Sequence, residues 1–163
     1  MIRIGATISV FVLLALAPAA QAQSQYDALV ARHAAANGVP ESLVRRVIVR
    51  ESRYNPRAIG LGGAMGMMQI KTATARAMGY TGTPAGLLDA DVNMTYAVKY
   101  LAGAYRAANG NHDLAVSYYA RGYYYQAKAQ GFLPYGATTE RRSRLPARTA
   151  WRVGANPTSE FIR

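Results

Sequence analysis

The sequence contains eight acidic residues, so the candidates for acid–base chemistry can be examined one at a time. Two of them, Glu140 and Glu160, lie in the arginine-rich last part of the chain. Five others lie near the starts of predicted helices, where a carboxylate stabilises the helix dipole by about 0.3–1 kcal/mol: Asp27, Glu41, Asp89, Asp91 and Asp113. Glu51 remains, near the end of a predicted helix, and is the candidate for chemistry.

Glu51 lies on an apolar stripe of its predicted helix. Leu43, Val47 and Glu51 are spaced by four, which places them on one helix face. Burial raises the pKa of a carboxyl group, and general-acid cleavage of a glycosidic bond requires a glutamate with a raised pKa. The pattern also fits a structural glutamate neutralised by an arginine such as Arg53 or Arg57. Position alone leaves both interpretations open.

Three other kinds of site are not supported by the sequence. His33 and His112 are far apart and lack the spacing of metal ligands. No serine lies in a Gly-x-Ser-x-Gly turn, and the glycines at 60–66 are not followed by the Gly-Lys-Ser/Thr of a phosphate-binding loop. We therefore expect neither a metal ion nor a cofactor.

The elements that must position Glu51 are predicted to be mainly helical. Residues 56–66 contain four glycines, which favours a loop or a short ribbon. No stretch alternates for long enough to predict a sheet. Helical patterns cover residues 25–37, 39–52, 67–78, 89–109, a stretch that begins near 113, and 123–130.

The two ends of the chain have a different character from the middle. Residues 1–22 combine an early arginine, an apolar run and Ala20-Gln21-Ala22, which predicts a signal peptide. The apolar run is too short and alanine-rich for a membrane anchor. Residues 23–133 form the predicted domain, and residues 134–163 a basic, weakly structured tail. Because the chain has no cysteine, the domain must fold without disulfides.

The net charge of +11 predicts an acidic partner. For an exported chain this indicates a wall polymer, an anionic lipid or a polysaccharide, whereas export argues against nucleic acid. We expect a periplasmic or wall-associated location and no stable membrane span after signal cleavage.

Three groups of residues resemble the motifs of one known family. Glu51-Ser52-x-x-Asn55-Pro56, followed by the run from Gly63 to Ile70, resembles the first two motifs of the soluble lytic transglycosylases of family 1. Leu88-Asp89-x-x-x-Asn93 is similar to the helix before the third motif, and residues 115–122 to the Ala-Tyr-Asn-Ala-Gly motif. The resemblance covers residues 25–130 and implies a mainly α, lysozyme-like domain with the glycine-rich segment at the active-site cleft.

The resemblance also implies roles for individual residues. Glu51 would be the catalytic acid and base. The residues that it places at the bound glycan are Ser52, Gly66, Met68, Gln69 and Tyr119. The chain departs from the family at three positions: Ala120 stands where asparagine is usual, Arg121 replaces a small residue, and Gly60 replaces a frequent serine.

The implied activity is non-hydrolytic cleavage of the β-1,4 bond between N-acetylmuramic acid and N-acetylglucosamine in peptidoglycan. The muramyl 6-hydroxyl would act as nucleophile and leave a 1,6-anhydro end, so one carboxylate suffices. The alternatives are a goose-type hydrolytic lysozyme, an inactive peptidoglycan-binding or secretion-assembly domain, and a cationic polymer-binding or membrane-active helical protein. Expected partners are glycan strands and, for a secretion-associated role, an envelope-spanning machine.

Overall fold

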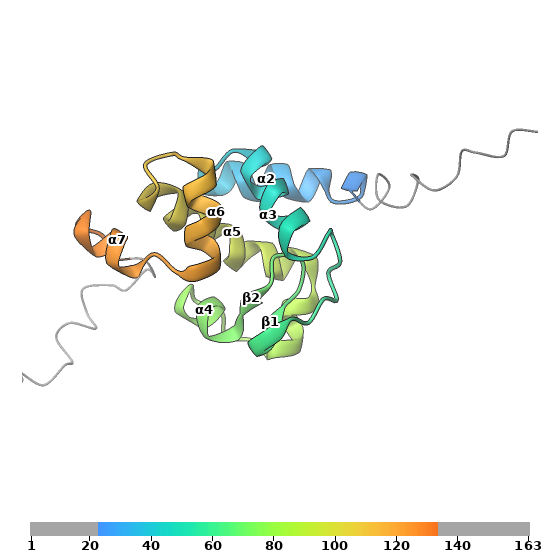
Figure 1. Ribbon diagram of the computed structural model, residues 1–163. Coiled ribbons are helices and arrows are strands. Elements are labelled where there is room, and N and C mark those ends of the chain that lie inside the picture. The colour runs from blue at the N-terminus through green and yellow to red at the C-terminus, as the bar shows by residue number, and fades with distance from the viewer. Residues whose placement is uncertain (1–22, 134–163) are drawn as a thin grey trace, which may run out of the picture.

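The computed structural model describes residues 23–133, and the predicted signal peptide and basic tail lie outside the described residues. Within this range the chain is mostly helical, which confirms the predicted fold class (Figure 1). The α-helices are α2 (Asp27–Asn37), α3 (Glu41–Glu51), α4 (Thr72–Ala77), α5 (Ala90–Ala107), α6 (His112–Arg121) and α7 (Tyr124–Ala129). Two 3₁₀ segments, η1 (Leu61–Gly63) and η2 (Pro84–Leu88), join them.

Helix α5 is the central element of the domain. It packs against α2, α4, α6 and α7 and against η2. Its buried side recurs at helical spacing through Ala97, Leu101 and Ala104, and the small alanines let neighbouring helices approach closely. The prediction that a long helix begins at Asp89 is confirmed, since the Asp89 side chain accepts a hydrogen bond from the Val92 amide at 2.9 Å.

Helix α3 carries the apolar stripe that ends at Glu51. Leu43 and Val47 are fully buried, as the spacing by four predicts. The helix ends at Glu51 because Arg53 and Tyr54 adopt left-handed backbone angles, with φ of 53° and 67°.

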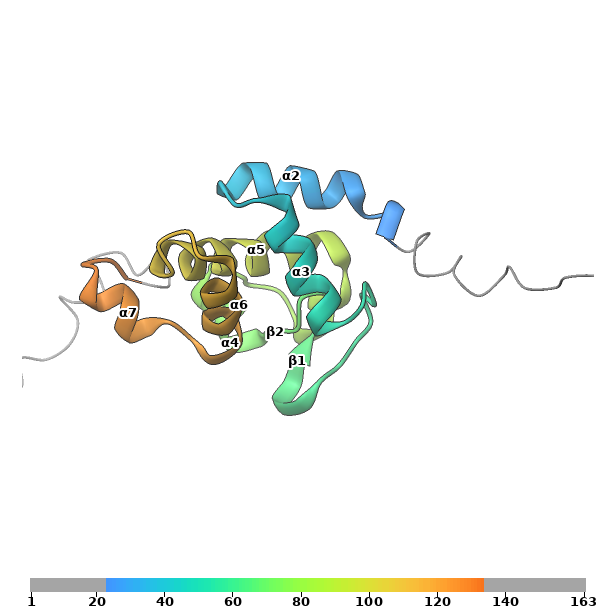
Figure 2. The same cartoon turned by 45° about the horizontal axis from the view of Figure 1, so that its top comes forward.

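Both ribbon views show α3 running from the end of α2 toward the small hairpin (Figures 1 and 2). Glu51 is the last residue of α3, and the next residue, Ser52, is hydrogen-bonded to Met67 in the hairpin turn.

The predicted helix over 67–78 is wrong in its first half. The chain forms a hairpin there, in which β1 (Ala64–Met65) pairs antiparallel with β2 (Ile70–Lys71), and helix begins only at Thr72. Gly66 and Gln69 have φ of 74° and 49°, which an α-helix cannot accommodate. Strands of two residues are too short to show alternation, so the sequence pattern did not indicate β2, whereas β1 lies in the segment predicted to be a loop or a short ribbon.

Candidate functional site

Glu51 occupies a partly buried position at the end of α3. Its side chain is 22% exposed, and the Arg50 Nε lies 3.7 Å from the Glu51 Oε1. Burial raises the pKa of the Glu51 carboxyl above its ordinary value, and the positive charge of Arg50 lowers that pKa by a smaller amount. Within residues 23–133, Arg53 and Arg57 form no ion pair, so neither neutralises Glu51. The surroundings of Glu51 therefore favour the protonated form of its carboxyl group.

The other carboxylates of the described residues serve the structure. Asp27 and Glu41 both pair with Arg45, which joins α2 to α3. Asp91 accepts from His33 at 2.6 Å, which is the main reason that its pKa is lowered, and also from Arg32. Asp113 pairs with Arg46 at 2.6 Å, and Asp89 caps α5. Of the acidic residues between 23 and 133, Glu51 is the one available for chemistry.

The turn at residues 66–69 accepts hydrogen bonds from two of the predicted site residues through its backbone carbonyls. The Ser52 Oγ donates to the Met67 carbonyl at 2.7 Å, which ties the residue next to Glu51 to the turn. The Tyr119 hydroxyl, from α6, donates to the Met68 carbonyl at 2.7 Å. The structure thus brings Ser52 and Tyr119 together with Glu51 around one short backbone segment.

Tyr119 lies within range of the charge of Glu51. Burial raises the pKa of Tyr119 well above its ordinary value, and electrostatic interaction with Glu51 and then with Tyr100 raises it further. The ring contacts that of Tyr100 edge to face, with centroids 5.3 Å apart. Tyr119 is therefore a neutral phenol whose proton is committed to the Met68 carbonyl.

Gln69 is held against the glycine-rich segment. Its Nε2 donates to the carbonyls of Ala58 at 3.0 Å and Gly66 at 2.9 Å. A Cβ at Gly60 would lie 2.2 Å from the Gln69 Oε1, so the amide occupies the space that a side chain at 60 would need. The resemblance implies serine at position 60, but the observed conformation of Gln69 leaves room only for glycine there.

Met68 and Gly66 lie inside the domain rather than on its surface. The Met68 side chain has no exposed area and belongs to the hydrophobic core. A Cβ at Gly66 would lie 2.2 Å from both the Asn93 Nδ2 and the Leu87 carbonyl oxygen. The structure therefore buries both predicted glycan-binding residues: the Met68 side chain packs in the core, and the Met68 backbone binds Asn93 and Tyr119.

Sequence reasoning missed a role for Asn93. It is fully buried on α5, and its amide binds three backbone groups of the hairpin and of η2. Buried polar side chains are almost always hydrogen-bonded, so an asparagine four positions before Ala97 and eight before Leu101, on the same apolar helix face, was a usable signal.

The two departures in α6 lie at its exposed end. Ala120 is exposed. Arg121 is also exposed, and its guanidinium lies over the Tyr118 ring, 5.1 Å from the centroid. A cation in the last turn also interacts favourably with the helix dipole. Arg121 thus has a structural contact of its own, away from the turn that holds Tyr119.

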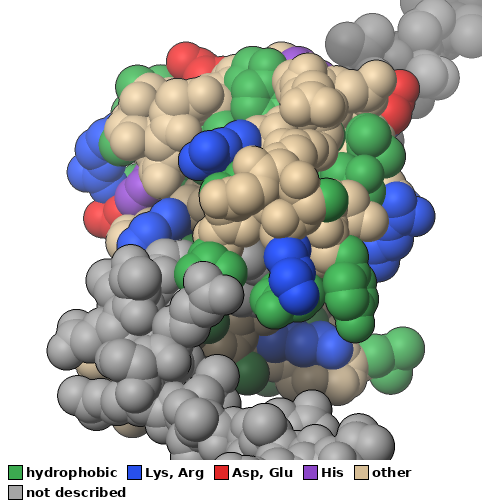
Figure 3. Space-filling view, turned by 90° about the vertical axis from the view of Figure 1, so that its left-hand side faces the viewer, with side chains coloured by type: hydrophobic (Ala, Val, Ile, Leu, Met, Phe, Trp, Pro, Cys, Tyr) green, Lys and Arg blue, Asp and Glu red, His purple; other side chains and the backbone are tan. Residues whose placement is uncertain are grey.

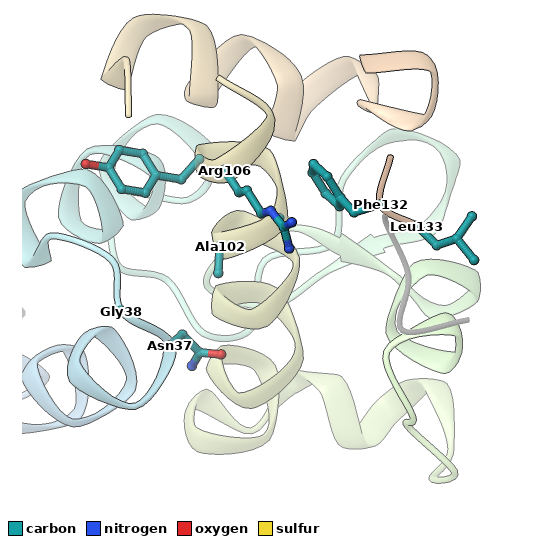
Figure 4. A pocket seen from close by; sticks show the side chains of 8 residues that line it. Asn37, Gly38, Ala102, Arg106, Phe132 and Leu133 are labelled. Atoms are coloured by element: carbon teal, nitrogen blue, oxygen red, sulfur yellow. The ribbon is translucent and has the colours of Figure 1, made fainter. Parts of the chain in front are cut away.

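A separate hollow of about 400 Å³ lies between α5, the end of α2 and the last described residues (Figure 4). Arg106 lies over the Phe132 ring at 4.1 Å from its centroid and forms part of the wall. None of the predicted site residues lines this hollow.

Within residues 23–133 there is no cluster of three or more histidine or acidic side chains suited to a metal ion. None of the helices in that range is long and apolar enough to cross a bilayer.

Residues 28–131 match the family described as "Transglycosylase SLT domain". This match covers well over half of the chain, and the chain belongs to that family.

Among curated proteins, the peptidoglycan transglycosylase gp16 of Escherichia phage T7 is 37% identical over 102 residues, 61% of this chain and 8% of that protein. The soluble lytic murein transglycosylase of Escherichia coli K12 is 29% identical over 104 residues, 60% of this chain and 16% of that protein. The same protein from Escherichia coli O157:H7 matches equally. The chain therefore aligns with only a small part of each of these relatives.

Proposed function

We propose that this chain is a lytic transglycosylase that cleaves the β-1,4 bond between N-acetylmuramic acid and N-acetylglucosamine in peptidoglycan. The observation that carries the proposal is the partly buried Glu51, whose pKa is raised by burial and which lies within the residues that match the family. The relatives named as peptidoglycan and murein transglycosylases support the substrate.

In the proposed reaction Glu51 acts twice. The protonated carboxyl donates its proton to the bridging oxygen, so that the N-acetylglucosamine leaves. The resulting carboxylate then takes the proton of the muramyl 6-hydroxyl as that oxygen attacks its own anomeric carbon. The product is a 1,6-anhydro sugar, no water is consumed, and the internal nucleophile gains a high effective molarity.

The charge environment of Glu51 favours this reaction over hydrolysis. Hydrolysing glycosidases of the usual kind place a second carboxylate about 5–9.5 Å from the first. Among residues 23–133, the other acidic side chains pair with basic side chains or cap a helix, and Arg50 is the charged group that lowers the pKa of Glu51. A one-carboxylate mechanism fits this arrangement.

We further propose that the chain is exported to the periplasm or the cell wall. The order of charge, apolar run and small residues in residues 1–22 supports a signal peptide, and the +11 charge suits an anionic wall. A secretion or envelope-spanning machine is a further proposed partner. Terminal sequencing of the exported chain tests the first point, and cleavage after Ala22 is expected.

The activity is tested by mass spectrometry of purified peptidoglycan after incubation with the full chain. Glu51→Gln is the test variant, and Glu41→Gln is the matched control because Glu41 lies at the exposed start of the same helix. Anhydro-muropeptides that vanish only with Glu51→Gln are expected. Reducing-end products would indicate a hydrolytic lysozyme instead, and wall binding without soluble products would indicate a binding domain.

A further inference from the structure

Asn93 binds two separate parts of the chain with a fully buried side chain. Its Oδ1 accepts from the Met68 amide at 2.9 Å. Its Nδ2 donates to the carbonyls of Met65 and Leu87, both at 2.8 Å. Asn93 thus joins α5 to strand β1 at Met65, to the hairpin turn at Met68 and to η2 at Leu87. An asparagine amide offers an acceptor oxygen and two N–H donors in one plane, and here the oxygen and both donors form hydrogen bonds.

The turn that Asn93 binds is the one that holds the site. The Met68 backbone amide donates to Asn93, and the Met68 carbonyl accepts from the Tyr119 hydroxyl. The preceding carbonyl, of Met67, accepts from Ser52, the neighbour of Glu51. A shift of the turn relative to α5 must therefore move Tyr119 or Ser52, or break their hydrogen bonds.

Gly66 provides a second, independent sign that the turn and Asn93 are matched. Gly66 has φ of 74° and no side chain. A Cβ at this position would lie 2.2 Å from the Asn93 Nδ2, so the Asn93 amide occupies the space that a side chain at 66 would need. The backbone is thus shaped to receive this amide in one position. A packed hydrophobic side chain at 93 would fill the space but remove the hydrogen bonds to the Met68 amide and to the carbonyls of Met65 and Leu87.

We propose that Asn93 is a positioning residue for the transglycosylase reaction. It holds the turn at residues 66–69 in one register with α5, so that Tyr119 and Ser52 stay in place beside Glu51. This inference rests on the proposed function. Asn93 itself is fully buried and touches no substrate, so its effect falls on the reacting geometry, where small displacements cost large factors in rate.

The test compares Asn93→Asp with Val98→Ala in the full chain. Asn93→Asp keeps the shape and the acceptor for the Met68 amide but loses the two amide donors. Val98 is fully buried on the same helix and makes no polar contact, so Val98→Ala loosens the core of α5 without changing the turn. Asn93→Ser serves as a second, uncharged variant if Asn93→Asp does not fold.

Release of soluble muropeptides is measured at a temperature at which the unfolding curves show every variant folded. We expect Asn93→Asp or Asn93→Ser to lower kcat about tenfold or more with KM changed less than about twofold. Val98→Ala should keep kcat within about twofold. Equal kcat for the Asn93 variants and the unaltered chain, or an equal loss with Val98→Ala, would overturn the inference and leave the proposed function standing. No product from the unaltered chain would overturn both.

Discussion

The hydroxyl of Tyr119 offers a sharp test of how the site is built. The hydroxyl donates to the Met68 carbonyl at 2.7 Å in a buried position. Tyr119→Phe removes this donor and leaves the carbonyl without it. A buried acceptor that loses its partner costs about 1–3 kcal/mol of unfolding free energy. Tyr119 is 8% exposed, so water has little access to restore the bond.

Tyr118 is a matched control on the neighbouring position of α6. It is also 8% exposed, and its hydroxyl makes no hydrogen bond to residues 23–133. Tyr118→Phe removes the same atom and should change the unfolding free energy by less than about 0.5 kcal/mol. The difference between the two variants isolates the hydrogen bond from the loss of a phenol oxygen.

Urea unfolding followed by circular dichroism measures both variants against the unaltered chain, with equal m values required for the comparison. Peptidoglycan digestion measures the activity, which should fall with Tyr119→Phe and persist with Tyr118→Phe, because only the former frees the turn beside Glu51. If Tyr119→Phe is as stable as Tyr118→Phe, the hydroxyl contributes nothing net, and our account of the turn is wrong.

Three further outcomes are expected. Gly60→Ala should displace the Gln69 amide, and the loss of its two hydrogen bonds should cost about 1–3 kcal/mol in urea unfolding; an unchanged midpoint would show that the amide shifts freely. Asp89→Ala should cost about 1 kcal/mol through loss of the cap on the Val92 amide, measured in the same way, while Asp89→Asn should cost much less. Because burial raises the pKa of Glu51, its protonated form favours folding, and this stability is lost as pH rises from the ordinary glutamate pKa through the raised one. Urea unfolding over that range should show Glu51→Gln gaining stability relative to the unaltered chain, and the opposite trend would contradict desolvation as the cause.

Local patterns predicted most of the helical framework. The spacing of Leu43, Val47 and Glu51 indicated one face of α3, and the structure buries the two apolar members. Asp89 was predicted near a helix start and caps α5. These predictions succeed because helix periodicity and capping depend on residues within one or two turns of each other.

The region from Met67 to Ile70 shows where local patterns fail. Its composition favours a continued helix, yet the chain turns, because Gly66 and Gln69 adopt left-handed angles and the hairpin is held from elsewhere. The hydrogen bonds that stabilise it come from Asn93, Tyr119 and Ser52, which lie between about 15 and 51 positions away. Interactions over such separations leave no periodic signal.

The candidate site divides in the same way. The sequence by itself determined that Glu51 is the carboxylate on an apolar helix face, since the apolar spacing and the positions of the other acidic residues are local properties. Only the tertiary structure decided that burial outweighs Arg50 in setting its pKa, that Met68 contributes its backbone while its side chain packs in the core, and that the turn is bound to α5 and α6. The physical reason is that desolvation and buried hydrogen bonds depend on which distant segments pack together, and that is settled only when the core forms.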